Sequence, residues 1–247
     1  MIKYIFLGFI QGVTEFLPVS SSAHLVVMQR LLGISNSQIA VTVVLHLGTS
    51  LALVIFFFKD IIRLFRDIKS LFLIVVVSVI TAGIGIGGRS FFESLFSSVR
   101  LVAVALACTG AILILTKRVS GYQRNKLNFK DALLLGLAQA AAIIPGISRS
   151  GVTIATLLFR KVDRETSFKF SFLASLPAIF GASLLEAKKI NFALQLDMAN
   201  FIAGFLASFL VGLLSLRLLK FILIKDRFYC FGYYCILFAA VIFLFVK

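Results

Sequence analysis

The sequence has 247 residues and a formal net charge of +15, and 60% of its residues are hydrophobic. A mean hydropathy of +1.07, with several apolar runs long enough to cross a bilayer, excludes a soluble domain and predicts a polytopic helical membrane protein. The lysines and arginines lie in short loops between the apolar runs, so we expect them to contact anionic membrane lipids and expect no nucleic acid partner.

The apolar segments follow one another in two sets along the chain. The first set has an interrupted segment at about 2–33 and full spans at about 38–58, 70–88 and 100–116. After a polar stretch at 117–130, the second set has an interrupted segment at about 131–159 and full spans at about 168–186, 198–216 and 229–246. No Pro-rich or low-complexity linker divides them, so we predict one all-α membrane domain, 1–247, with six transmembrane helices and two re-entrant helix pairs.

The two interrupted segments share a sequence pattern at an offset of 128 residues. Its members are Leu7, Gly8, Gln11 and Ser20 in the first copy and Leu135, Gly136, Gln139 and Ser148 in the second. Three crossings, an odd number, separate the copies, so the halves at about 1–116 and 131–247 are predicted to be inverted repeats. Chance similarity between apolar helices is the alternative explanation.

The basic residues predict an orientation in the membrane. If each interrupted segment enters and leaves on one side, 17 of the lysines and arginines share one face and seven lie on the other. The positive-inside rule makes the face with 17 charges cytoplasmic and directs both termini outward. The two interrupted segments then dip in from opposite sides, and we expect their tips to meet near mid-membrane.

Glu15 is the acidic residue that lies well inside an apolar segment, whereas the other nine fall in loops or near predicted helix ends. An ionisable group within the membrane is a functional-site hypothesis by default. Gln11 lies four residues earlier, on the same helix face, so the two side chains can present oxygen atoms to one cation or water. The alternative is a glutamate that only fixes packing by a hydrogen bond between helices.

Pro18 interrupts the first segment because proline lacks a backbone N–H and disfavours helix at the preceding Leu17. A second helix should start near Ser20. Capping of that helix explains one of the three serines Ser20, Ser21 and Ser22, but the free N–H groups and partial positive charge of a helix start also suit an anion such as phosphate. His24 returns to the face of Ser20 and is suited to acid, base or nucleophilic chemistry.

The second interrupted segment contains a buried arginine in the sequence from Pro145 to Thr153. The planar guanidinium of Arg149 matches a pair of phosphate oxygens, and Ser148, Ser150 and Thr153 add neutral donors beside it. The alternative is an ion pair between Arg149 and Glu15 that only holds the two repeats together.

Two further features carry weaker indications. His46, in the first full span, can hydrogen-bond to a neighbouring helix or line the pocket, and we assign it no role. The glycines between Gly83 and Gly88 lack the strand context of a nucleotide-binding fingerprint, so we interpret them as sites of close helix packing.

The two motifs together resemble the undecaprenyl-diphosphate phosphatase family, integral membrane enzymes also associated with bacitracin resistance. The family's first motif, [E/Q]xxxE followed by FLPVSS and a histidine, is matched by Gln11, Glu15, the run from Phe16 to Ser21, and His24. Its second motif, PGxSRSxxT, is matched from Pro145 to Thr153, and a downstream FSFLxxxP pattern from Phe170 to Pro177.

This resemblance implies hydrolysis of a C55 polyprenyl diphosphate to the monophosphate carrier lipid and inorganic phosphate. It also implies a divalent cation, Mg²⁺ or Ca²⁺, a bacterial inner-membrane location, a role in cell-wall synthesis, and a site open toward the outer face. Many members carry Glu where this chain has Gln11, so one carboxylate is missing.

These observations lead to one set of predicted site residues. The predicted catalytic residues are Glu15, Ser21, His24 and Arg149, the predicted substrate-binding residues are Ser20, Ser22, Gly146, Ser148, Ser150 and Thr153, and the predicted metal ligands are Glu15 and Gln11. The nucleophile stays open among His24, Ser21 and water: a trapped phosphohistidine would indicate His24, and attack by Ser21 would make His24 its base.

The leading alternative function is a transporter or flippase of a polyprenyl phosphate lipid, because inverted repeats and broken helices are typical of transporters. The combination of Glu15, His24, a serine cluster and Arg149 favours the enzyme, since passage of a headgroup needs less reactive chemistry. The oligomeric state is open, with a homodimer among the alternatives.

Overall fold

The computed structural model describes residues 1–33, 38–95, 98–121, 124–187 and 198–245, and these form a bundle of α-helices. The helices of the first half are α1 (Ile2–Phe16), α2 (Ser21–Leu31), α3 (Gln38–Phe56), α4 (Phe58–Leu64), α5 (Ile68–Gly87), α6 (Arg89–Leu95) and α7 (Val99–Leu115), followed by the 3₁₀ turn η1 (Thr116–Arg118). The helices of the second half are α8 (Phe129–Ala141), α9 (Arg149–Phe159), α10 (Arg164–Ala187), α11 (Met198–Ile224) and α12 (Cys230–Phe245).

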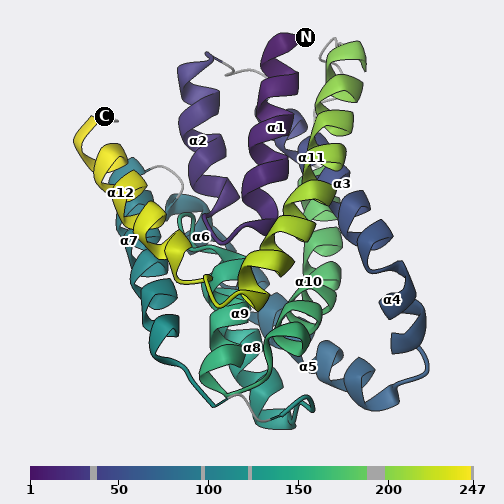
Figure 1. The fold of residues 1–247 in the computed structure, drawn as a ribbon. Helices are drawn as coiled ribbons and strands as arrows, with labels where there is room; N and C mark the ends of the chain where they lie inside the picture. Colours follow the sequence, from purple (N-terminus) through teal and green to yellow (C-terminus); the bar gives the residue numbers. More distant parts are fainter. Residues whose placement is uncertain (34–37, 96–97, 122–123, 188–197, 246–247) are drawn as a thin grey trace.

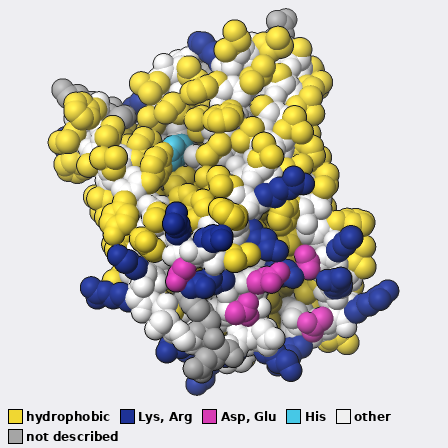
Figure 2. Space-filling view, in the orientation of Figure 1, with side chains coloured by type: hydrophobic (Ala, Val, Ile, Leu, Met, Phe, Trp, Pro, Cys, Tyr) yellow, Lys and Arg dark blue, Asp and Glu magenta, His cyan; other side chains and the backbone are white. Residues whose placement is uncertain are grey.

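The bundle has the composition of a membrane protein. Four of its described segments, Ile39–Phe56, Ile68–Gly87, Val99–Arg118 and Met198–Ile224, are long and apolar enough to cross a bilayer. Hydrophobic side chains cover the upper part of the face in Figure 2, whereas Lys, Arg, Asp and Glu gather toward the lower end. The chain is therefore an all-helical membrane protein.

Helix boundaries differ from the predicted spans where charged residues continue a helix. The span predicted at 198–216 belongs to α11, which extends to Ile224 through Arg217 and Lys220. The span predicted at 168–186 belongs to α10, which begins at Arg164. Hydropathy detects the apolar length of a helix, and long basic side chains allow the same helix to continue into the polar headgroup region.

The first interruption falls where Pro18 predicted it. α1 ends at Phe16, and Leu17 is extended, with ψ of 145°. The Ser20 side chain accepts a hydrogen bond from the Ala23 amide (3.4 Å) as the N-cap of α2. Ser20 itself has a φ of +66°, a strained conformation for a residue other than glycine, and such strain clusters at functional sites.

The second interruption repeats this capping in the other half. α8 ends at Ala141 and α9 begins at Arg149, with Ser148 as its N-cap. The Ser148 side chain accepts a hydrogen bond from the Gly151 amide at 3.2 Å. The two caps therefore stand 128 residues apart and have the same role, as the sequence pattern predicted.

The two halves interlock. α1 packs along α11, α8 packs along α5, and α7 packs along α12, so the broken element of each half lies against a long helix of the other. In Figure 1 both termini lie at one end, α1 and α2 extend inward from that end, and α8 and α9 extend inward from the opposite end. The two interruptions consequently meet inside the bundle.

Glycines allow the closest of these helix crossings. A Cβ at Gly8 would lie 2.4 Å from the Gly204 carbonyl oxygen of α11, and one at Gly110 would lie 2.8 Å from the Gly232 oxygen of α12. The interpretation of the glycines between Gly83 and Gly88 as close packing sites is wrong for Gly83 and Gly87, where a Cβ would meet no atom of the described residues within 4 Å. Composition alone does not reveal which helix face meets a neighbour.

Replacing Gly8 by alanine is expected to destabilise the protein by about 1–3 kcal/mol, because the new methyl group overlaps backbone and forces α1 and α11 apart. The measurement is the thermal unfolding midpoint in detergent. Gly83→Ala is the matched control, since that position is open and alanine favours helix. Equal midpoints for Gly8→Ala and wild type would contradict the close α1–α11 contact.

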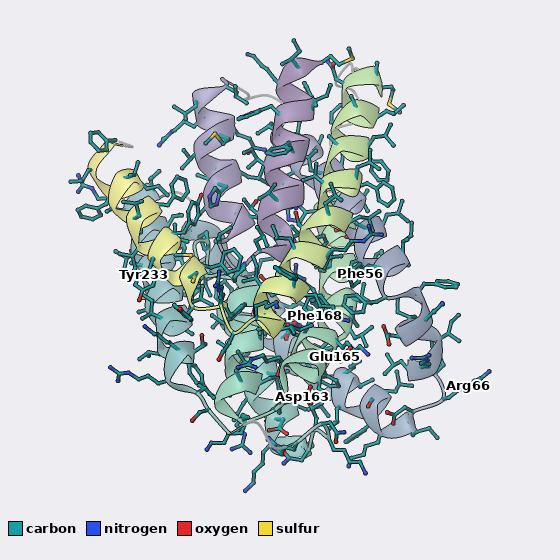
Figure 3. All side chains as sticks on the ribbon, viewed as in Figure 1. Phe56, Arg66, Asp163, Glu165, Phe168 and Tyr233 are labelled. Carbon is teal, nitrogen blue, oxygen red and sulfur yellow. The ribbon has the colours of Figure 1, made fainter. Side chains whose placement is uncertain are left out.

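An aromatic cluster packs α1, α3 and α10 together beside the first interruption. Phe16 lies 5.7 Å from Phe172 between ring centroids, and Phe168 lies 6.1 Å from Phe56 and 5.5 Å from Phe57. Figure 3 labels Phe56 and Phe168, which come from α3 and α10. Because Phe16 follows Glu15 directly, this cluster fixes the end of α1 that carries the carboxylate.

A polar cluster holds together the start of α8 and the end of α9, at the end of this element that lies away from the interruption. Asp131 is fully buried and accepts hydrogen bonds from Arg124 Nη1 (2.8 Å), Arg124 Nη2 (2.9 Å), Arg160 Nε (3.0 Å) and the Asn128 amide (2.9 Å). Arg124 also donates to the Arg160 carbonyl at 2.9 Å. The carboxylate thus joins the loop before α8 to the end of α9.

Candidate active site

The site forms where the two interruptions meet, and Glu15 is at its centre. The Glu15 side chain is 5% exposed. Its Oε2 accepts hydrogen bonds from Ser21 Oγ (2.7 Å) and Gln11 Nε2 (3.0 Å), and its Oε1 accepts one from Arg149 Nη2. A single buried carboxylate is therefore bound by residues from α1, α2 and α9, and by both halves of the chain.

Arg149 is the first residue of α9, and its side chain is 19% exposed. One guanidinium nitrogen, Nη2, pairs with Glu15, as the ion-pair alternative of the sequence analysis anticipated. The other, Nη1, is buried and has no hydrogen-bond partner within the described part of the chain. A buried donor without a partner costs about 1–3 kcal/mol, and a hydrogen bond to an anionic oxygen atom would offset that cost. Binding of an anion at Nη1 stays a prediction.

Serine pairs mark the starts of both helices. Ser20 Oγ lies 3.1 Å from Ser22 Oγ, and Ser148 Oγ lies 3.3 Å from Ser150 Oγ. In each repeat the two serines occupy the N-cap and the second residue of the helix. The starts of α2 and α9 therefore present matching hydroxyl pairs beside their positively polarised ends.

These serines also join the two interruptions to each other. Ser22 Oγ accepts a hydrogen bond from the Gly146 amide (3.4 Å), and Ser150 Oγ donates one to the Leu17 carbonyl (3.3 Å). The predicted substrate-binding hydroxyls are thus brought together, and in this arrangement they bond to protein atoms. Substrate binding by these serines stays a prediction.

Gly146 occupies a position that only glycine fits. Its φ is +101°, and a Cβ there would lie 2.3 Å from the Val102 carbonyl oxygen of α7. Thr109 of α7 donates to the Gly146 carbonyl (3.2 Å) and accepts from the Ser148 amide (3.1 Å). Sequence reasoning missed Thr109, because a single threonine in an apolar helix gives no signal of its own.

Thr153 contacts the backbone of the helix it belongs to. Its hydroxyl donates to the Arg149 carbonyl and accepts from Ser171 Oγ of α10, both at 2.6 Å. This hydroxyl therefore braces the first turn of α9 against α10, behind the arginine. Its predicted contact with substrate is untested.

His24 points toward α12. The Ser20 carbonyl can only accept, so His24 Nδ1 carries the proton and donates to it at 2.8 Å, and Nε2 accepts from the Tyr234 hydroxyl at 2.7 Å. Phe238 stacks on the imidazole ring at 4.3 Å. Among the described residues no hydrogen bond or ion pair joins His24 to Glu15 or Arg149, and sequence reasoning missed Tyr234 as its partner.

His46 lies near the carboxylate. Its Nε2 is 3.5 Å from Glu15 Oε2, and its Nδ1 donates to the Thr42 carbonyl at 2.8 Å. The structure thus places His46 beside the site carboxylate of the neighbouring helix α1, and whether it also lines a pocket stays a prediction. Its proximity to Glu15 could not be deduced from spacing, since the two residues lie on different helices.

The donor set around Glu15 fits a divalent cation that is shared with a phosphate ligand. Gln11 is fully buried, and its Oε1 has no hydrogen-bond partner among the described residues. No group of three or more His, Cys, Asp and Glu side chains suited to a metal occurs in the described ranges. One carboxylate and one free amide oxygen match Mg²⁺ sites in which substrate phosphates supply further ligands.

Comparison with known proteins shows similarity along nearly the whole chain. Residues 4–241 match the family model described as "Bacitracin resistance protein BacA". The chain is 44% identical over 241 residues to the undecaprenyl-diphosphatase of Halothermothrix orenii, covering 94% of this chain and 93% of the relative. It is 40% identical over 237 residues to that of Carboxydothermus hydrogenoformans (92% and 90%) and 40% identical over 243 residues to that of Methanococcus vannielii (94% and 95%).

Proposed function

The chain belongs to the bacitracin resistance protein BacA family, and we infer from this premise that it is an undecaprenyl-diphosphatase. It hydrolyses undecaprenyl diphosphate to undecaprenyl phosphate and inorganic phosphate. This reaction recycles the carrier lipid for cell-wall synthesis and accounts for bacitracin resistance. The observation in the site that carries the inference is the buried, unpartnered Nη1 of Arg149 beside Glu15, inside an apolar bundle.

The reaction requires stabilisation of negative charge on the transferred phosphoryl group and an in-line nucleophile. Arg149 supplies a planar pair of donors, of which Nη1 is free to receive the first phosphate oxygen. The starts of α2 and α9 add partial positive charge from two directions. In this proposal the bound diphosphate replaces Glu15 as the anionic partner of Arg149 Nη2.

The proposed cation is Mg²⁺ or Ca²⁺, held by the Glu15 carboxylate and Gln11 Oε1 together with phosphate oxygens. When bound, it neutralises charge on the diphosphate. The buried Gln11 Oε1, which has no hydrogen-bond partner among the described residues, supports this assignment.

The nucleophile is proposed to be Ser21 or a water molecule, activated by Glu15. The Ser21 hydroxyl donates to Glu15 Oε2 at 2.7 Å, the geometry that a general base needs. No hydrogen bond joins Ser21 to His24 in the described structure, and His24 Nε2 is occupied by Tyr234. His24 is proposed as a proton donor that acts only after Tyr234 releases Nε2 and Nε2 takes up a proton from water.

The proposed topology has six transmembrane helices and two re-entrant pairs, α1–α2 and α8–α9, in inverted repeats within one domain. The reciprocal packing of α1 on α11 and α8 on α5 supports it. With 17 of 25 basic residues at one face, that face is proposed to be cytoplasmic, and the termini and the site opening face outward from the inner membrane.

Purified protein in detergent is expected to release inorganic phosphate from undecaprenyl diphosphate. EDTA is expected to abolish this release, and addition of Mg²⁺ or Ca²⁺ in excess of the EDTA is expected to restore it. The measurement is phosphate release over time. Lys220→Ala, in an exposed pair with Glu165, is the matched control and should keep full activity.

Transport of a polyprenyl phosphate lipid is the second candidate, because the two interlocked interruptions are typical of transporters. Binding of intact diphosphate without any phosphate release, by well-folded protein with cation present, would favour the transporter.

A further inference from the structure

Resting on the function proposed above, we propose that His46 is the third protein ligand of the divalent cation held by Glu15 and Gln11. Neither the family motifs nor the composition assigns His46 a role. The proposal rests on three side chains that meet from two helices, α1 and α3: His46 Nε2 lies 3.5 Å from Glu15 Oε2, and Gln11, which also contacts Glu15, has a buried Oε1 without a hydrogen-bond partner among the described residues.

The first argument concerns the imidazole of His46. Its Nδ1 lies 2.8 Å from the Thr42 carbonyl oxygen, which can only accept a hydrogen bond. In the neutral ring, Nδ1 therefore carries the proton and Nε2 presents a lone pair. That lone pair faces a carboxylate, so a cation between them removes the repulsion. The bond of Nδ1 to a backbone carbonyl is also the arrangement typical of metal-binding histidines.

The second argument concerns distance. His46 Nε2 lies 3.5 Å from Glu15 Oε2. A charge-assisted hydrogen bond between an imidazolium and a carboxylate is about 2.7–2.9 Å long, so this separation is too large for one. Two ligands of one ion, each roughly 2.1 Å from it, stand about 3.0–3.5 Å apart at ordinary bond angles. The observed separation matches the second case.

The third argument concerns Gln11. Its amide nitrogen donates to Glu15 Oε2 (3.0 Å) and Thr49 Oγ1 (3.4 Å), while Oε1 is buried and unpartnered in the described structure. Turning the amide about its last side-chain bond places Oε1 beside the carboxylate, where an ion would bind it. The bond from Gln11 to Thr49 joins α1 to α3, and Thr49 in turn donates to the His46 carbonyl at 3.0 Å within α3.

The proposed ligands Glu15, Gln11 and His46 favour different metal ions from those that a pair of carboxylates would favour. Gln11 contributes a neutral oxygen where a second carboxylate would add negative charge, and His46 contributes a neutral nitrogen. A mixed set of carboxylate, amide and imidazole suits Mn²⁺ better than Ca²⁺, which prefers oxygen ligands. The His46 side chain is 28% exposed, whereas that of Glu15 is 5% exposed.

The test uses Mn²⁺ alone as the probe, on full-length protein in detergent with an affinity tag that contains no histidine. The chain has two histidines, so an imidazole nitrogen bound to Mn²⁺ comes from His24 or His46. Pulsed electron paramagnetic resonance detects such a nitrogen through its magnetic coupling to the ion. Wild type is expected to show the coupling, His46→Gln to lose it and to bind Mn²⁺ roughly tenfold or more weakly, and His24→Gln to keep it.

The outcomes separate this proposal from the proposed function. Mn²⁺ binding by wild type without nitrogen coupling, coupling that survives in His46→Gln, or no Mn²⁺ binding by folded wild type would each overturn the role of His46. Phosphate release is measured on the same samples with Mg²⁺. Release by wild type without nitrogen coupling rejects only the His46 ligand, whereas coupling without any release rejects only the hydrolase.

Discussion

Replacing Arg149 by methionine is expected to reduce phosphate release by about 10³- to 10⁵-fold, the range found when an arginine that stabilises a transferring phosphoryl group is removed. The same substitution leaves Glu15 buried without its cationic partner, and breaking a buried ion pair in this way costs about 3–5 kcal/mol. Loss of activity alone therefore cannot distinguish a catalytic arginine from a structural one.

A double variant separates the two roles. Glu15→Gln combined with Arg149→Met removes both charges, so it is expected to regain most of the thermal stability lost in Arg149→Met while phosphate release stays absent. Arg149→Lys adds a second comparison, because lysine keeps the ion pair but lacks the planar pair of donors. It should fold normally and still release phosphate far more slowly than wild type.

The measurements are the unfolding midpoint in detergent and the rate of phosphate release for all three variants. Arg63→Met is the matched control, since Arg63 forms a surface pair with Asp60 and its side chain is largely exposed. Wild-type rates in Arg149→Lys would show that the arginine serves only as a positive charge that holds the repeats together.

Asp131→Asn is expected to lower the free energy of unfolding by about 3–5 kcal/mol, the largest stability effect that we predict outside the site. The carboxylate is fully buried and forms ion pairs with both Arg124 and Arg160. The asparagine side chain would point its NH₂ group at guanidinium N–H groups, which are also hydrogen-bond donors, and its neutral amide would remove the ion pairs. The contact between the start of α8 and the end of α9 would then be lost.

Unfolding midpoints in detergent test this prediction. Asp226→Asn is the matched control, because Asp226 also pairs with an arginine, Arg164, at 2.7 Å, but its side chain is 64% exposed. The control should change stability by less than about 1 kcal/mol. Equal effects of the two substitutions would contradict a special role for burial at Asp131.

Features set by local chain chemistry could be predicted from the sequence. Pro18 fixed the end of α1, and the serines 128 residues apart became the N-caps of α2 and α9. The ion pair between Glu15 and Arg149 was among the stated alternatives, because few groups within an apolar bundle can neutralise a buried charge. These inferences depend only on short-range rules and on the cost of charge in a membrane.

Contacts between distant helices could not be predicted in the same way. The partner of His24 is Tyr234, which lies 210 positions away on a uniformly apolar helix. Thr109, which holds both Gly146 and Ser148, is likewise one polar residue in an apolar run. The short helices α4 and α6 were also missed, since seven residues give too little hydropathy signal. Which face of a helix meets which neighbour is decided by packing, and a single sequence does not contain that pairing explicitly.

The interlocking of the two halves has a consequence for how the protein is made. The ribosome delivers α1 to the membrane first, but the helix that packs along it, α11, and the arginine that neutralises Glu15 emerge only after α8. Until Arg149 has been synthesised, Glu15 has no cationic partner from the second half. The element formed by α1 and α2 therefore gains the ion pair that joins it to the second half only late in translation.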